Sequence, residues 1–327
     1  MLKSKSKYYY SKLDNGSKAV YDSILSAWEV YNQNPSFQMD GKINMQKIFE
    51  YIKFDNPGLF FVDFKSISVS GSGSSGKVQS SFLYNKNQII NMEKKIEAII
   101  ASILLSDNFK TADSYGKEII LHDYLVKHIV YTLNTSNDET TSVAGALLAG
   151  KAVCEGFAKA FKLLCDNAGL SCIFVSGKAV SPYGIGQERH AWNIIKIDNA
   201  CAHIDVTWDN TSGGGDNCYD HFNLTDDDVK KDHTWEKALF PMCNSPQLNY
   251  YLKNKICAAN REEFIKFIKE QAKQGKKMIS VKLTGREITN DQLMKAVNEA
   301  LFGIIKPGQQ LGFQYNKYRH IVKVKIL

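Results

Sequence analysis

The sequence predicts an α+β protein, in which helical and strand-like stretches follow one another without an internal repeat. Apolar residues recur at helical spacing over residues 17–33, 88–105 and 114–131. Residues 58–84 and 190–208 are instead rich in β-branched and aromatic residues, which favour strands. The tail beyond residue 250 alternates both patterns, so a further small α+β unit is expected there.

We expect three parts along the chain. Residues 1–110 form an N-terminal helical and β-hairpin region, because the glycine–serine loop at 71–76 separates two strand-like segments. Residues 111–246 form a central core that contains a polar loop at 135–142, and residues 247–327 form a small basic α+β domain. The elements expected in the tail are a strand near 250–257, a helix at 261–274, a strand at 277–283, a helix at 289–302 and paired strands through 311–327.

The composition is that of an ordinary globular protein, with 44% hydrophobic and 23% charged residues and no apolar run that could span a bilayer. The first residues carry lysines without an apolar segment behind them, unlike a secretory signal. We therefore expect a cytoplasmic protein if residue 1 is the native start, and an extracellular one if an exported chain was trimmed. The odd count of seven cysteines and the lack of a C-x-x-C pair favour reduced thiols.

The positive charge lies in the C-terminal segment. The chain carries a net +7, but residues 251–327 hold 16 Lys and Arg against 6 Asp and Glu, a net +10 that leaves −3 for the rest. An anionic partner of the C-terminal domain and a solvated lysine-rich face both fit this charge. No nucleic-acid-binding motif accompanies the lysines, so nucleic acid is not an expected partner.

The stretch AVCEGFAKAFKLLCDNAGL at 152–170 predicts an amphipathic helix that begins at a thiol. Phe157, Phe161 and Leu164 lie on one stripe, and Gly169 is able to end the helix. At the first turn, unpaired N–H groups and the helix dipole favour the thiolate form of Cys154, which is the nucleophile. Taken alone, however, a cysteine such as Cys154 is more often a small core residue than a nucleophile.

Two strand-like segments downstream supply a histidine and an aspartate. HAWNIIKI and AHIDVTW flank the turn residues 198–199, which predicts a hairpin with a two-residue loop. That loop gives the register Ile197–Ala200, Trp192–Asp205 and His190–Thr207. His190 and Asp205 then become diagonal neighbours on one face, so the aspartate is able to orient the imidazole toward Cys154. Alone, His190 would be an ordinary strand histidine, and only the joint occurrence favours a triad.

These segments resemble the bacterial members of the transglutaminase-like superfamily, which belongs to the papain-like cysteine enzymes. The resemblance rests on VCEGFAKAF at 153–161, HAWN at 190–193 and DVTWD at 205–209. HDYLVKHIVY at 122–131 and YDHFNL at 219–224 also resemble family segments. The resemblance implies a papain-like core, in which the nucleophile helix packs on an antiparallel sheet, with N-terminal and C-terminal appendages around this core.

The resemblance also implies an acyl-enzyme mechanism on a protein or peptide substrate. Cys154 attacks a carboxamide or peptide carbonyl, His190 serves as base and then acid, and the thioester passes to an amine or to water. The Cys154 N–H holds the oxyanion, whereas Val143 occupies the place where relatives carry a tyrosine as a further donor. Candidates for the substrate pocket are Trp192, Glu155 and Trp208.

Two alternatives remain open at this stage: a cysteine protease or amidase on the same fold, and a catalytically silent binding or scaffold module. We expect no cofactor and no metal. No EF-hand-like acidic loop is present. His122 and His128 do not share one helix face, so each is expected to be packed or solvated.

Overall fold

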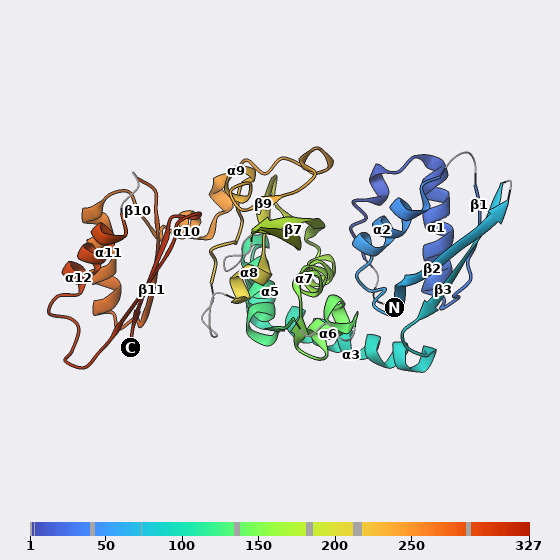
Figure 1. Ribbon diagram of the computed structural model, residues 1–327. Coiled ribbons are helices and arrows are strands. Elements are labelled where there is room, and N and C mark those ends of the chain that lie inside the picture. Colours follow the sequence, from blue (N-terminus) through green and yellow to red (C-terminus); the bar gives the residue numbers. More distant parts are fainter. Residues whose placement is uncertain are drawn as a thin grey trace.

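The structure is a computed structural model that describes residues 2, 4–39, 43–72, 74–133, 138–180, 186–211, 218–285 and 289–327. Gly73 of the glycine–serine loop and residues 134–137 near the predicted polar loop lie outside the described residues. Figure 1 shows three blocks in a row: N-terminal elements at one end, a central block around helix α7, and the C-terminal elements at the other end. The predicted boundaries at residues 110 and 246 stay predictions.

The N-terminal block combines two helices with a three-stranded antiparallel sheet of order β1-β3-β2. The predicted hairpin around the glycine–serine loop is confirmed by the pairing of β2 with β3. The predicted helix at 17–33 begins earlier, where Asp14 caps Ser17 N, and ends at Glu29, since Tyr31 adopts a φ of 63° that no helix continues. The elements are η1 (Tyr10–Lys12), α1 (Asn15–Glu29), β1 (Ser36–Gln38), α2 (Met45–Asp55), β2 (Val62–Ser72) and β3 (Ser75–Phe82).

A helical layer leads into the central block. The predicted helix at 88–105 is confirmed, while the one at 114–131 ends at His128, and residues 130–131 instead pair in parallel with residues 151–152. The elements here are α3 (Lys86–Leu104), α4 (Asp107–Thr111), α5 (Ser114–His128), β4 (Val130–Tyr131), η2 (Asp138–Thr141), α6 (Val143–Leu147), β5 (Lys151–Ala152) and α7 (Cys154–Ala168).

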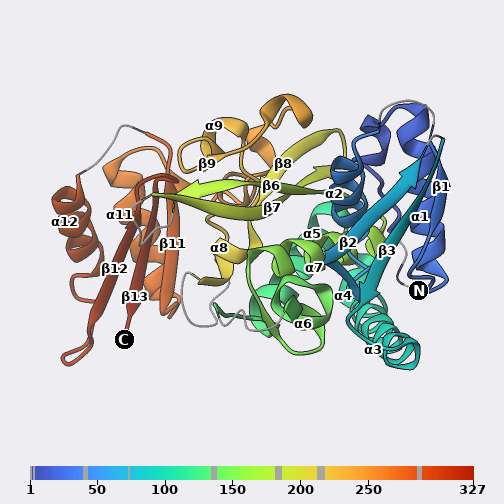
Figure 2. The same ribbon diagram turned by 45° about the vertical axis from the view of Figure 1, so that its right-hand side comes forward.

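Helix α7 packs on a curled antiparallel sheet of order β8-β7-β6-β9, as the family resemblance implied (Figure 2). Gly169, with a φ of 78°, ends the helix at its predicted C-terminus. The sheet consists of β6 (Ser171–Val180), β7 (Gln187–Ile197), β8 (Ala200–Ile204) and β9 (His233–Thr234).

The predicted two-residue turn between β7 and β8 is confirmed, because Ile197 pairs with Ala200 and Asp198 has a φ of 53°. The prediction of a strand up to residue 208 is wrong. Strand β8 ends at Ile204, and Val206–Thr211 forms helix α8, so Thr207 is not a strand partner of His190. The cause is Asp205, whose Oδ1 accepts the Trp208 N–H at 3.1 Å and starts a helix in the manner of an N-cap.

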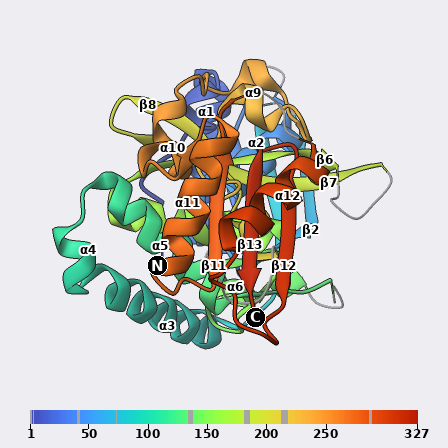
Figure 3. The same ribbon diagram turned by 90° about the vertical axis from the view of Figure 1, so that its left-hand side faces the viewer.

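The C-terminal block is a four-stranded sheet of order β10-β11-β13-β12, with α11 and α12 packed against each other (Figure 3). The predicted strand near 250–257 is wrong at its start. Residues 250–253 form a helical turn, because Lys253 N bonds Asn249 O and Lys255 then reverses the chain at a φ of 56°. The elements from the central block onward are α9 (Asp226–Val229), η3 (Lys237–Leu239), η4 (Pro246–Leu248), α10 (Tyr250–Lys253), β10 (Cys257–Ala258), α11 (Arg261–Lys273), β11 (Met278–Leu283), α12 (Asn290–Leu301), β12 (Leu311–Asn316) and β13 (Ile321–Ile326).

The buried apolar residues form two main clusters. One runs from Leu2 to Tyr251 and also takes in Ile321, so the N-terminal and central blocks share a core. The other runs from Ala258 to Val324. Among the described residues, none of the helices combines the length and hydropathy that a membrane crossing requires. All seven cysteines are free thiols.

Candidate active site

The candidate nucleophile is the first residue of α7. Cys154 is half-buried, and in the described part of the chain no side chain caps this helix N-terminus. The first-turn N–H groups therefore remain available to an anion beside the thiol. A glycine is required at position 156, because a Cβ there would lie 2.4 Å from Thr140 O, where η2 passes the first turn.

His190 and Asp205 meet as the hairpin register predicted. Nε2 of His190 lies 2.6 Å from Oδ2 of Asp205, which leaves Nδ1 as the nitrogen for another partner. Burial alone would lower the pKa of His190, but the charge of Asp205, together with the nearby Cys154, raises this pKa to about 10. Burial likewise acts to raise the pKa of Asp205, yet His190 and His233 hold it below its usual range. The site thus favours an imidazolium next to Cys154. The catalytic role of all three residues stays a prediction.

The three predicted pocket residues differ in how far they are accessible. Trp192 is only 1% exposed, its Nε1–H donates to His203 Nδ1 at 3.0 Å, and its ring stacks behind His190. Trp208 is half-buried, with its ring centroid 5.5 Å from that of His190. Glu155 forms ion pairs of 2.7 Å with both Lys53 and Lys159. Trp208 and Glu155 therefore retain accessible surface, whereas Trp192 supports the histidine from inside.

The N-terminal block also borders the site. Lys53 on α2 pairs with Glu155, the residue after the nucleophile. Phe54 stacks on Phe174 of β6 with ring centroids 4.8 Å apart, and it packs in the same small cluster as Cys154. Helix α2 thus covers one side of the α7 N-terminus.

His233 is a site residue that the sequence analysis missed. Its Nε2 lies 3.3 Å from Oδ2 of Asp205, and its Nδ1 lies 2.6 Å from Oδ1 of Asp232. The ring is buried between Trp208 and Trp192, at centroid distances of 4.4 and 4.9 Å. The sequence carries no usable signal for it, because β9 is a two-residue strand whose pairing with β6 is decided by tertiary structure.

Gly177 makes this packing possible. It lies opposite His190 on β6, and a Cβ there would lie 2.3 Å from Thr234 O and 2.7 Å from Cη2 of Trp192. Only a residue without a side chain lets β9 and the tryptophan approach this closely.

A second buried aspartate, Asp209, links three separate segments of the chain. Oδ2 of Asp209 lies 3.2 Å from Nε2 of His122, and Oδ1 lies 3.4 Å from Nδ1 of His221. Burial lowers the pKa of His122, but Asp123 and Asp209 outweigh it and raise the pKa to about 9. Asp209 thereby joins α5 and the segment 219–224 to α8. The expectation that His122 is a packed histidine is confirmed, since it is fully buried.

Tyr131 also borders the nucleophile and was missed. Strand β4 places it beside Ala152, two residues before Cys154. Burial raises the pKa of its phenol, and the charge of Cys154 adds to this effect. The hydroxyl therefore keeps its proton and is a hydrogen-bond donor near the thiol.

Within the described residues, two groups of side chains have ligand atoms close enough for a metal: His190, Asp205 and His233, and His203, Asp226 and Cys243. In the second group, Trp192 donates to His203 Nδ1, so Nε2 carries the proton and donates to Asp226 at 3.0 Å. A neutral histidine that binds a metal through Nε2 needs the proton on Nδ1, where it would oppose the Trp192 N–H. Hydrogen bonds explain both groups without a metal.

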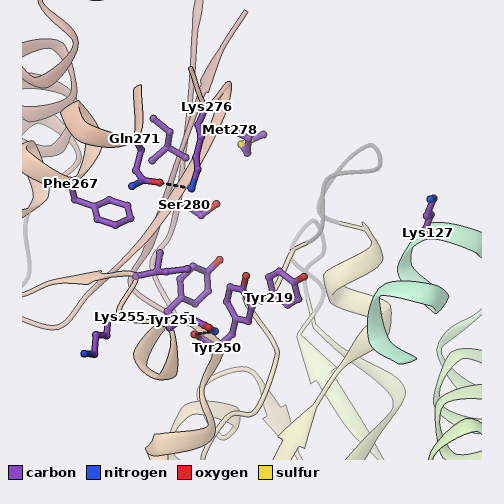
Figure 4. Close-up of a pocket in the computed structure, with 13 residues that line it drawn as sticks. Lys127, Tyr219, Tyr250, Tyr251, Lys255, Phe267, Gln271, Lys276, Met278 and Ser280 are labelled. Atoms are coloured by element: carbon purple, nitrogen blue, oxygen red, sulfur yellow. Dashed lines mark hydrogen bonds between the residues drawn. The ribbon is translucent and has the colours of Figure 1, made fainter. Parts of the chain in front are cut away.

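A cavity of about 740 Å³ lies where the C-terminal block meets the central block. Figure 4 shows Tyr219, Tyr250 and Tyr251 on one side of it and Lys276 on the other, with Lys127 further away. None of the triad residues lines this cavity, so it is separate from the candidate active site.

Residues 105–206 match the family model of the transglutaminase-like superfamily, and this segment holds Cys154, His190 and Asp205. This part of the chain is therefore similar to the transglutaminase-like superfamily. Together, the family and the site support a thiol-dependent acyl transfer or hydrolysis. A search among curated proteins finds no significant match.

The solved structures that match this chain are only distantly similar to it. A candidate cysteine protease from Cytophaga hutchinsonii has a TM-score of 0.30 at 13% identity, over 44% of this chain and 62% of that one. A TGase has a TM-score of 0.31 at 14% identity, over 55% of this chain and 52% of that one. Menin, described with its binding site for the Mixed Lineage Leukemia protein, has a TM-score of 0.28 at 13% identity, over 71% and 49% of the two chains. The chain thus spans less than two thirds of each, and likenesses at these TM-scores carry no argument about function.

Proposed function

We propose that the protein is a cysteine enzyme that acts on a protein or peptide carboxamide through Cys154, His190 and Asp205. The observation that carries the proposal is the 2.6 Å contact of His190 Nε2 with Asp205, which leaves Nδ1 for the thiol at the α7 N-terminus. This is the arrangement that a thiol nucleophile needs: an adjacent base and a third group that orients the base.

In the proposed reaction, the Cys154 thiolate attacks the carbonyl carbon and the C=O electron pair moves to oxygen. The Cys154 N–H stabilises this oxyanion, and the Tyr131 hydroxyl is the proposed further donor. His190 then gives its Nδ1 proton to the leaving nitrogen, the C–N bond breaks, and a thioester remains. An amine or a water molecule attacks the thioester, His190 takes its proton, and the thiolate is regenerated.

Thiol reactivity tests the enzyme directly. Iodoacetamide should alkylate Cys154 at neutral pH much faster than Cys201 or Cys257, which are also half-buried free thiols. Cys154→Ala should abolish turnover with the fold intact, and Cys257→Ala is the matched control that should leave turnover unchanged. A Cys154 that reacts no faster than the other two would favour a binding module instead.

The acceptor is decided by incubating the protein with casein and a fluorescent primary amine. Labelled casein would support acyl transfer to an amine, and shortened casein would support hydrolysis of peptide bonds. If Cys154 is reactive but neither product forms, casein is excluded as a substrate and the proposed thiol chemistry still stands.

A further inference from the structure

A continuous chain of buried polar side chains leads from His190 to the C-terminal block. Asp205 Oδ2 is shared by His190 and His233, at 2.6 and 3.3 Å. The other nitrogen of His233 lies 2.6 Å from Asp232 Oδ1, and Nη2 of Arg319 donates to that same oxygen at 2.6 Å. None of these five side chains is more than 9% exposed.

The contacts along this row of side chains pair each carboxylate with basic groups. An ionised carboxylate only accepts, and each nitrogen of His233 lies against such an oxygen, one of Asp205 and one of Asp232. Burial acts to raise the pKa of Asp205 and Asp232, but His190 and His233 lower the first, and His233 and Arg319 lower the second. Each of the two buried carboxylates therefore lies between basic side chains, which is the condition under which charges can be buried. The titratable groups that face His233 are Asp205, Asp232, His190 and His203.

Arg319 belongs to the turn between β12 and β13, yet it is fully buried against the central block. Its Nη1 donates to Asp228 O and its Nη2 to Asp232, both at 2.6 Å. A guanidinium with two such acceptors has a fixed orientation. The hairpin therefore inserts one arginine that holds Asp232 against helix α9.

We infer that His233 is a positioning residue for Asp205 and, through it, for His190, and that Arg319 makes the C-terminal block part of the catalytic site. The inference rests on the proposed function, because the group that is positioned is the orienting aspartate. His233 donates to the oxygen that also binds His190, so it restricts the rotation of the Asp205 carboxylate. Arg319 fixes Asp232 and thereby the ring of His233.

The test is the rate of Cys154 alkylation by iodoacetamide in the full-length protein, between about pH 4 and pH 9, where thiols and imidazoles titrate. The variants are His233→Ala and Arg319→Met. Lys323→Met is the matched control. Lys323 is also a largely buried cation of the C-terminal block, but it binds Asp220 at 3.0 Å and makes no part of the row of side chains from His190 to Arg319.

We expect the pH of half-maximal alkylation to rise by about 0.5 or more in both test variants, because each loses a contact that holds the Asp205 carboxylate against His190. Arg319→Lys should return it toward the wild-type value, and His233→Ala carries the test if Arg319→Met fails to fold in a thermal melt. Lys323→Met should leave it unchanged.

If Cys154 is selectively reactive in the wild type but its alkylation has the same pH dependence in the test variants as in Lys323→Met, this inference alone is overturned. A wild-type Cys154 no more reactive than Cys201 and Cys257 would overturn the proposed function, and the inference with it. The two failures are therefore distinguishable.

Discussion

Replacing Asp205 by asparagine tests the orienting role of this carboxylate. Oδ2 accepts from His190 and His233, while Oδ1 accepts the Trp208 N–H. An amide has one acceptor oxygen, so one of these positions becomes a donor. If the NH2 group faces His190, then Nε2 must accept, Nδ1 carries the only ring proton, and the imidazole cannot take a proton from Cys154.

The magnitude follows from the pKa of His190. That pKa is raised from 6.5 to about 10, and the charge of Asp205 is the main cause that raises it. Without this charge, the imidazolium is no longer favoured at neutral pH. A neighbouring cation promotes thiol reactivity, so alkylation of Cys154 at pH 7 should slow about 30-fold when it is lost.

The matched control is Asp209→Asn, the same chemical change at the other buried aspartate of the segment 205–209. Asp209 binds His122 and His221 rather than the triad histidine. It should destabilise the fold in a thermal melt but keep the alkylation rate at pH 7 within about twofold of wild type, since the effect of a charge falls off with distance. Equal slowing in both variants, or none in Asp205→Asn, would refute the orienting role.

Three further results are expected. Burial raises the pKa of Glu118 from 4.5 to about 8. The folded protein therefore holds this proton more tightly than the unfolded chain does, and the free energy of unfolding falls as the pH rises from about 4.5 toward 8. Glu118→Gln should raise the free energy of unfolding by about 2 kcal/mol at pH 8.5 and leave it unchanged at pH 4. Gly177→Ala should cost about 1–3 kcal/mol in urea unfolding, because its Cβ would meet Thr234 O and the Trp192 ring, and an unchanged midpoint would contradict this. Tyr131→Phe should lower turnover about 100-fold without slowing Cys154 alkylation, as expected for an oxyanion donor; equal turnover would exclude that role.

The parts of the site that could be predicted are those set by local sequence. The helix at Cys154 follows from apolar periodicity, and the β7–β8 register follows from a two-residue turn, which fixes every strand pair beyond it. The end of β8 could not be predicted in this way. DVTW has the composition of a strand, but the bond from Trp208 N to the Asp205 carboxylate starts a helix there, and the propensity is overridden.

The remaining site residues depend on contacts across long stretches of chain. His233 is 28 residues from Asp205, and Arg319 is 87 residues from Asp232. Neither spacing corresponds to a helix or strand period, so no pattern in the sequence brings them together. Asp209 and His122 are likewise 87 residues apart.

Contacts from outside the family segment therefore also hold the proposed triad. Residues 105–206 include the proposed triad, but Lys162 of α7 is 1% exposed and its ammonium is satisfied in part by Ser6 O at 2.9 Å. Removing the N-terminal block would leave this buried cation short of an acceptor, which is costly. Removing everything after residue 206 would take away His233 and leave His190 as the only imidazole on Asp205 Oδ2. Both flanking blocks thus contribute contacts to the elements that carry the proposed triad.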